Sequence, residues 1–404
     1  MTGGPSIRFA AARFLATALT GLALAAPAPA QTDLGLWDES PGPLVRTIRQ
    51  GIDAYYGFDY AGARSRFDRV VAERPDHPAG WFLRAEAAWW MYINDRRNAG
   101  ARRRLESDLA TAIEKAEARL RVQPDDVETL FILGSAYGRR GMLAGTEKDA
   151  WGAARDARRA REHLDRVQEL DPGNVDALAA QGLYQYYVGT FGAVTRAASR
   201  LLFGLRGDRR RGLQYLDRAR TRGVYTRTEA AFFQGLFYLQ FEDRPERAQP
   251  ILDGLRRRYP ENLYFATMAA YARQRQADLG AARVLYERTL ERLAATRVYG
   301  AEGESITRLF YGQTLLALGD LDGAQREFTR VVGLRAEESD SWPHAYLWLG
   351  RLSDLRGERE TARRYYRRVI QLPDAADSHD EARRLMGTPF ASGDVPALVS
   401  GADR

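Results

Sequence analysis

The chain has 404 residues, of which 45% are hydrophobic and 28% charged, a balance that argues against a disordered, collagen-like or multi-span membrane protein. It contains no cysteine, which excludes disulfides, thiolate metal sites, a cysteine nucleophile and a lipid-modified cysteine anchor. The formal net charge is +7, and nearly all of the 60 basic residues are arginines, since the only lysines are Lys115 and Lys148. A GC-rich genome also favours arginine, so the basic count alone does not indicate nucleic-acid binding.

The first 30 residues are expected to form a secretory signal peptide rather than part of the fold. Arg8 and Arg13 precede the uncharged apolar run 14–26, and Ala28-Pro29-Ala30 supplies small residues before a cleavage site. We therefore expect cleavage near Ala30 and a periplasmic or exported protein, with an uncleaved anchor as the less favoured alternative. Residues 31–43 would then form an N-terminal linker.

Helical hairpins of about 34 residues repeat along residues 44–386. The two clearest copies begin at Ser305 and Pro343 and align without a gap. They share five positions, namely Gly312, Leu315, Ala324, Phe328 and Val331 in the first copy and Gly350, Ser353, Ala362, Tyr366 and Val369 in the second. Small residues let two helices cross closely, and bulky residues one turn later fill the space between them. Six weaker copies precede these two, so the sequence predicts an all-α solenoid of about eight hairpins.

The remaining residues are assigned to insertions and ends. Extra residues fall in hairpins two to four, near positions 93–109, 141–155 and 188–209. A short capping helix over residues 378–386 is expected to cover the last hairpin, as a solenoid requires for solubility. Residues 387–404 are rich in Gly, Ser, Ala and Pro and predict a disordered tail.

The repeated small, aromatic and alanine positions resemble the tetratricopeptide repeat (TPR) family. The resemblance covers the repeat region and implies that the first helix of each hairpin lines a concave groove, in which TPR proteins bind their partners. A second, local resemblance lies between Gly182 and Leu216. That glycine-rich apolar stretch looks like a eukaryotic TPR family linked to the mitochondrial outer membrane and to lipid droplets.

Paired aromatic residues recur at the implied groove positions in three of the first four hairpins. The candidate partner-binding residues are Tyr55, Tyr56, Phe82, Glu86, Trp89, Trp90, Arg139, Tyr186 and Tyr187. We expect them to bind an extended peptide or a polymer chain, because aromatic anchors give large contact areas and their faces also stack on sugars. The alternative is that the aromatic pairs are core residues covered by other helices.

The motifs in the sequence do not indicate an enzyme. Its four histidines lie in different hairpins without metal-ligand spacing, and no phosphate-binding loop follows a strand pattern. Asp320-Leu321-Asp322-Gly323 resembles the start of a calcium loop, and Arg206-Gly207-Asp208 resembles an adhesion tripeptide. The first motif falls on the turn between the two helices of a hairpin and is interpreted as a structural turn. In the second, Asp208 precedes a predicted helix, where it makes a good N-cap. We therefore expect no catalysis, no cofactor and no bound metal.

Two arginine-rich features suggest further partners. The apolar segment Phe191–Arg211 could lie on an anionic membrane, although packing across the solenoid is favoured because Gly204 and Gly207 interrupt its apolar face. Basic runs such as 102–104 alternate with acidic residues and are interpreted as solvated helix faces, so nucleic acid is not an expected partner.

The sequence as a whole favours a non-catalytic protein–protein interaction scaffold of the bacterial cell envelope. The alternative is a module that binds a cell-surface polymer or an anionic lipid. The identity of the partner and the oligomeric state stay open.

Overall fold

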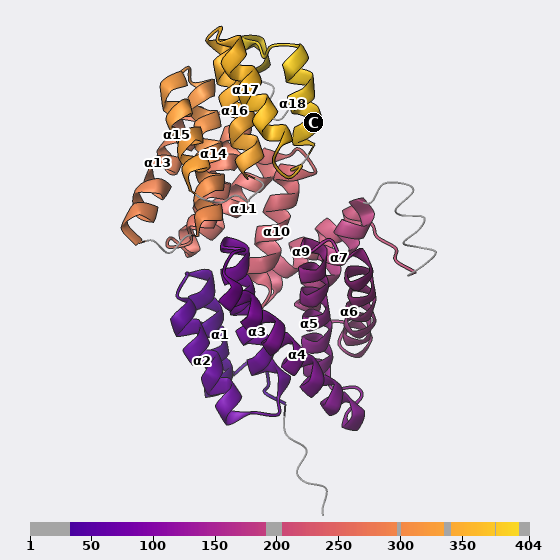
Figure 1. The fold of residues 1–404 in the computed structure, drawn as a ribbon. Coiled ribbons are helices and arrows are strands. Elements are labelled where there is room, and N and C mark those ends of the chain that lie inside the picture. Colours follow the sequence, from indigo (N-terminus) through magenta and orange to yellow (C-terminus); the bar gives the residue numbers. More distant parts are fainter. Residues whose placement is uncertain (1–32, 191–203, 297–299, 335–340, 376, 396–404) are drawn as a thin grey trace, which may run out of the picture.

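The computed structural model describes residues 33–190, 204–296, 300–334, 341–375 and 377–395. Within these ranges every regular element is helical (Figure 1). Sixteen of the described α-helices pair as eight successive hairpins, and a further helix packs on the last of them. The predicted all-α solenoid of about eight hairpins is therefore confirmed.

The helices differ in length because some of the predicted insertions extend them. Near residues 93–109 and 141–155 the extra residues lengthen α4 to 24 residues and α6 to 21 residues. The middle of the third insertion, residues 191–203, lies outside the described residues. The elements are α1 (Pro43–Tyr56), α2 (Tyr60–Glu73), α3 (Pro78–Asn94), α4 (Ala99–Val122), α5 (Val127–Thr146), α6 (Ala150–Leu170), α7 (Ala177–Thr190), α9 (Arg209–Arg222), α10 (Arg227–Gln240), α11 (Pro245–Arg258), α12 (Leu263–Arg275), α13 (Leu279–Thr296), α14 (Ala301–Ala317), α15 (Leu321–Gly333), α16 (Ser341–Leu355), α17 (Arg359–Ile370), α18 (Ser378–Gly387) and the 3-10 helix η1 (Ser392–Asp394).

In most hairpins a glycine on the first helix faces a bulky side chain on the second, either an aromatic ring or, as at Gly134 and Leu164, a leucine. A Cβ atom added to Gly312 would lie 2.5 Å from the ring of Phe328, and one added to Gly350 would lie 2.3 Å from the ring of Tyr366. Both rings are fully buried. The helices can therefore approach this closely only because the first helix carries no side chain at the crossing point.

The turn inside the hairpins repeats a simple arrangement. A residue with left-handed backbone ends the first helix in several hairpins, as at Ala277 (φ 60°) and Gly319 (φ 85°). The aspartate that follows caps the second helix, so that Asp320 accepts the N–H of Gly323 at 2.8 Å. Asp208 caps α9 in the same way, through the N–H of Arg211 at 3.0 Å. Both motifs are thus structural turns, as interpreted from the sequence.

The C-terminal end of the solenoid is covered by α18 and by the segment after it. Helix α18 packs on α16 and α17, where the capping helix was expected. Residues 388–395, predicted as part of a disordered tail, have a defined path instead: Phe390 is buried, and its N–H donates to Asp354 at 2.9 Å. Residues 396–404 lie outside the described residues. Among the helices that the structure describes, none has the length and apolarity needed to cross a bilayer.

A buried histidine begins α3. The Nδ1 atom of His77 accepts the N–H of Ala79 at 3.3 Å, and its Nε2 atom lies 3.8 Å from the carboxylate of Glu128. Burial, together with the nearby positive charge of Arg119, lowers the pKa of His77 to about 4. The imidazole is therefore neutral in the folded protein at neutral pH, which suits its role as an N-cap acceptor.

His77 should make the protein less stable as the pH falls from about 7 to 5. The unfolded chain takes up the proton near pH 6.5 and the folded chain only near pH 4, so the free energy of unfolding should fall by about 2 kcal/mol over this range. Urea unfolding at a series of pH values measures this loss. The variant His77→Asn keeps a capping acceptor and should lack this part of the pH dependence; an unchanged profile in the variant would contradict the assignment.

Candidate functional site

The candidate residues from the sequence all lie on first helices, and the structure brings them to the inside of the superhelix. Tyr55, Tyr56, Trp89, Trp90 and Tyr186 are each at most 4% exposed. The remaining candidates are also covered: Glu86 and Arg139 are buried, and Phe82 and Tyr187 are half-buried. The structure thus places these side chains in the core, which is the alternative that the sequence left open.

Helices from the middle of the chain cover these aromatic residues. In Figure 1, α10 lies directly above α3, near the point where the superhelix returns to its start. The ring of Trp90 lies 5.6 Å from that of Phe232 on α10, and the ring of Tyr56 lies 5.6 Å from that of Tyr259 after α11. Asn262 also donates to the carbonyl of Tyr56 at 2.8 Å. The inner face of the first two hairpins is therefore occupied by the chain itself, and binding of a partner by these residues stays a prediction.

A buried ionic cluster lies within this closed part of the superhelix. Arg139 on α5 donates to both oxygens of Glu86 on α3 at 2.6 Å, and to Glu229 on α10 at 2.6 Å. Its guanidinium stacks on the ring of Trp89, 4.8 Å from the centroid. Burial raises the pKa of Glu86 above its usual range, and Arg139 opposes this rise. The cluster ties three hairpins together, and sequence reasoning had assigned Glu86 and Arg139 to partner binding.

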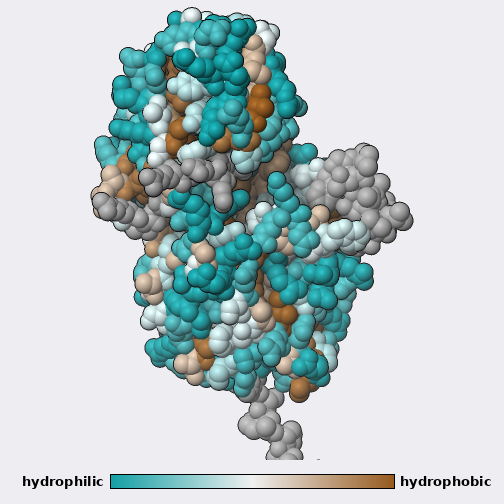
Figure 2. Space-filling view, viewed as in Figure 1, coloured by the Kyte–Doolittle hydropathy of each residue, from teal (hydrophilic) through white to brown (hydrophobic). Residues whose placement is uncertain are grey.

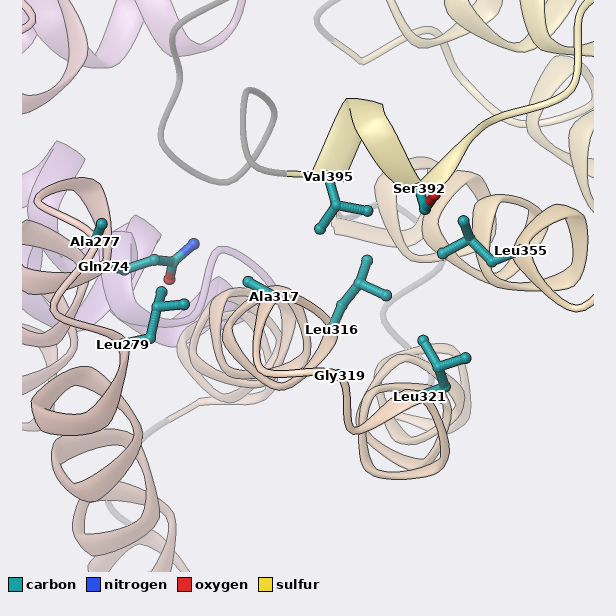
Figure 3. Close-up of a pocket in the computed structure, with 10 residues that line it drawn as sticks. All are labelled: Gln274, Ala277, Leu279, Leu316, Ala317, Gly319, Leu321, Leu355, Ser392 and Val395. Carbon is teal, nitrogen blue, oxygen red and sulfur yellow. The ribbon is translucent and has the colours of Figure 1, made fainter.

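The last three hairpins keep an accessible apolar depression, which we call the C-terminal groove (Figure 3). Its volume is about 620 Å³, and it opens to solvent. Figure 2 shows apolar surface between hydrophilic ridges in this upper half of the molecule. The groove is lined by Gln274, Ala277, Leu279, Leu316, Ala317, Gly319, Leu321, Leu355, Ser392 and Val395.

Equivalent positions of successive hairpins build this groove. Leu279 and Leu321 each follow the capping aspartate at the start of a second helix, and Leu316 and Leu355 come from the ends of first helices. Figure 3 shows Val395, from the segment after α18, above Leu316. Gln274 is the polar residue at one end, and its amide is already engaged with Tyr286, Gln313 and Thr314. The groove therefore offers a mainly apolar surface to a ligand.

Sequence reasoning missed the C-terminal groove. The candidate positions drawn from the sequence lie on the implied groove face of the first helices, whereas most lining residues lie at the turns between helices or at the helix ends next to them. One signal was present in the sequence, namely the repeated pair Asp278-Leu279 and Asp320-Leu321, which places a leucine at a helix start where other hairpins have Ala150 or Arg359.

The structure describes only the end of the arginine-edged segment Phe191–Arg211. Residues 191–203 lie outside the described residues. Beyond them Arg209 pairs with Glu242 at 2.6 Å, and Arg211 donates to Tyr215 at 2.8 Å. The possible membrane contact of this segment stays a prediction. Among the described residues no group of His, Asp and Glu side chains is arranged to hold a metal ion.

Two stretches of the chain match a known protein family. A family model described as tetratricopeptide repeat matches residues 48–89 and 312–380, which fall in the first two and the last two hairpins. These hairpins are tetratricopeptide repeats. A TPR fold suggests a protein–protein interaction scaffold, because stacked TPR hairpins present extended concave surfaces. Among curated proteins, no sequence matches the chain.

Several solved structures are similar to the chain over much of its length. The human IFIT1 dimer with PPP-AAAA is 13% identical, with 90% of this chain and 92% of that chain covered and a TM-score of 0.47. A TPR protein from Parabacteroides merdae is 14% identical, with 70% and 94% covered and a TM-score of 0.42. Yeast Tom70 is 11% identical, with 85% and 88% covered and a TM-score of 0.39. The exclusion of nucleic acid that was drawn from the sequence stays a prediction.

Proposed function

We propose that the chain is a non-catalytic scaffold of the bacterial cell envelope that binds an extended segment of a protein partner in the C-terminal groove. The observation that carries the proposal is the contrast between the two ends of the TPR array. The inner face of the first hairpins is filled by α10 and by the residues after α11, whereas the groove of the last hairpins is open and apolar.

The shape of the groove favours a protein segment over a compact ligand. Its lining repeats from hairpin to hairpin, so that successive apolar side chains of an extended peptide would meet similar surfaces. Its apolar lining also disfavours a highly charged polymer, because charged groups would lose water without gaining partners. The envelope location rests on the sequence of residues 1–30, which lie outside the described residues.

Photo-crosslinking in the producing cell tests this proposal. A photoreactive phenylalanine at Leu321 or Leu355 should give a discrete crosslinked protein, recovered in the envelope fraction. The same group at Val122, an apolar residue that is 81% exposed at the end of α4, serves as the control and should not give that product.

Three results would contradict the proposal. Crosslinks equal at all three positions would show that the groove is not selective, and a nuclease-sensitive product would point to nucleic acid. Recovery of the protein in the cytosol, with residues 1–30 retained, would overturn the envelope assignment.

A further inference from the structure

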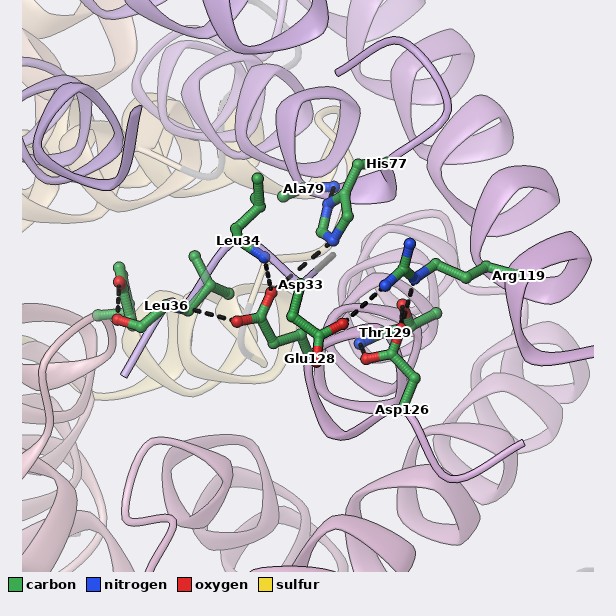
Figure 4. Close-up of polar contacts among 10 residues, drawn as sticks. Asp33, Leu34, Leu36, His77, Ala79, Arg119, Asp126, Glu128 and Thr129 are labelled. Atoms are coloured by element: carbon green, nitrogen blue, oxygen red, sulfur yellow. Dashed lines mark hydrogen bonds and ion pairs between the residues drawn. The ribbon is translucent and has the colours of Figure 1, made fainter. Parts of the chain in front are cut away.

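The N-terminal segment Asp33–Trp37, which we call the strap, is held across an edge of the superhelix. This edge is where α5, α7 and α10, the first helices of hairpins three to five, begin. Figure 4 shows the strap residues Asp33, Leu34 and Leu36 next to Glu128 and Arg119. Sequence analysis assigned these residues to a linker, whereas Leu36 is only 4% exposed.

The edge recognises the backbone of the strap. The carboxylate of Glu128, itself 5% exposed, accepts the N–H of Leu34 at 2.9 Å and the N–H of Leu36 at 2.7 Å. Gly35 lies between them with φ 70°, the left-handed region that only glycine adopts freely. The carbonyl of Leu36 accepts from the hydroxyl of Tyr225 and from Arg49. Both backbone polar groups of Leu36 are therefore paired with the superhelix, and the N–H of Asp38 closes a turn onto the carbonyl of Gly35 at 3.1 Å.

The edge also recognises side chains of the strap. The indole N–H of Trp37 donates to Asp176 at 2.9 Å, and its ring meets the rings of Phe131 and Tyr225 edge to face at 5.3 and 6.2 Å. At the outer end Asp33 pairs with Arg119 at 2.7 Å. The combination selects a turned segment with leucine, glycine, leucine and tryptophan in succession.

Asp176 does not depend on the strap for its position. Its carboxylate also accepts the N–H groups of Val224, Tyr225 and Thr226, at 2.9 to 3.1 Å, from the turn before α10. The acceptor for the tryptophan is thus fixed by the superhelix itself. Such preorganisation lowers the entropic cost of binding a peptide.

A short segment, residues 38–42, joins the strap to α1. Most of the strap's contacts are with hairpins three to five. Arg119 on α4 adds a contact from hairpin two, and Arg49 adds one from the hairpin to which the strap is attached. Residues 38–42, which link it to α1, are mostly exposed. An identical segment from another molecule could therefore make the same contacts, as in domain swapping.

We propose that this edge is a self-contained peptide-binding site, separate from the C-terminal groove, which accepts the strap in trans, so that one copy of the chain docks on a second copy. The occupant is the segment Asp33–Trp37, and the recognised chemistry is the paired Leu34 and Leu36 amides together with the Trp37 indole.

A first experiment asks whether the site binds a free peptide. A specific protease sequence is inserted within residues 38–42 of the mature chain, and after cleavage a labelled peptide of residues 31–40 is added in excess. The peptide should displace the cleaved strap from the site. Binding should raise the fluorescence anisotropy of its label. A peptide with Trp37→Ala should bind at least about tenfold more weakly, as should the normal peptide to Glu128→Gln protein. Glu169→Gln, a change at an exposed carboxylate, should leave binding unchanged.

A second experiment asks whether a second copy supplies the strap. One variant lacks residues 31–37, and the other keeps the strap but carries Glu128→Gln and Asp176→Asn. Each alone should be monomeric in light scattering, and the mixture should form a one-to-one complex. If the deletion variant does not show native circular dichroism, the protease-cleaved chain, freed of its strap, replaces it.

Two outcomes would overturn the proposal. The first is a natively folded, cleaved chain that fails to immobilise the peptide or binds it equally well with Glu128→Gln. The second is that the two variants form no complex when they are mixed at protein concentrations above the dissociation constant measured for the peptide.

Discussion

Replacing Arg139 by methionine is expected to lower the free energy of unfolding by about 3–5 kcal/mol. The guanidinium pairs with Glu86 and with Glu229 at 2.6 Å, and the side chains of Arg139 and Glu86 are only 5% and 6% exposed. Without it, two carboxylates would lie close together with little access to water. Urea denaturation at neutral pH, followed by circular dichroism, measures the loss.

The control is an ion pair of the same kind on the surface. Arg158 and Glu162 lie 2.8 Å apart, and both side chains are at least half exposed, so Arg158→Met should cost less than about 1 kcal/mol. Adding Glu86→Gln and Glu229→Gln to Arg139→Met should recover part of the loss. If Arg139→Met were as stable as Arg158→Met, the ionic cluster would not be what ties the three hairpins together.

Replacing Trp90 by alanine is expected to cost about 3–5 kcal/mol, as for other large aromatic residues in cores. The indole is 2% exposed and lies between the rings of Tyr56, at 5.1 Å, and Phe232, at 5.6 Å. A second change, Trp89→Ala, should then leave little folded protein at 37 °C. Thermal unfolding followed by circular dichroism gives both results.

Trp151 offers a matched control, because its side chain is 66% exposed at the start of α6. Trp151→Ala should change stability by less than about 1 kcal/mol. If Trp90→Ala were equally harmless and instead removed the crosslinked partner, the aromatic pairs would belong to a binding groove after all.

Local rules were sufficient to predict the hairpins. The paired Gly312 and Phe328 positions require two helices to cross closely, and Asp208 caps a helix as its sequence context indicates, while Asp320 lies at the turn expected there. The candidate site was less predictable, because periodicity identifies the face of a helix but not what covers it. Tyr56 meets Tyr259, about 200 residues away, and this contact depends on the curvature of the whole array. The strap was not predicted for a similar reason, since its acceptor Glu128 lies 92 residues from Leu36 in the sequence.

The return of α10 and α12 onto the first hairpins changes how the array should fold. In an open repeat array each unit interacts only with its neighbours, so that stability is nearly a sum over repeats and unfolding can start at either end. Here one apolar cluster runs from Leu36 to Ala272, and separate clusters serve the last hairpins. The first part should therefore behave as one cooperative unit of high contact order that forms slowly, whereas the hairpins from α14 onward keep the local independence of an ordinary array and can open without it.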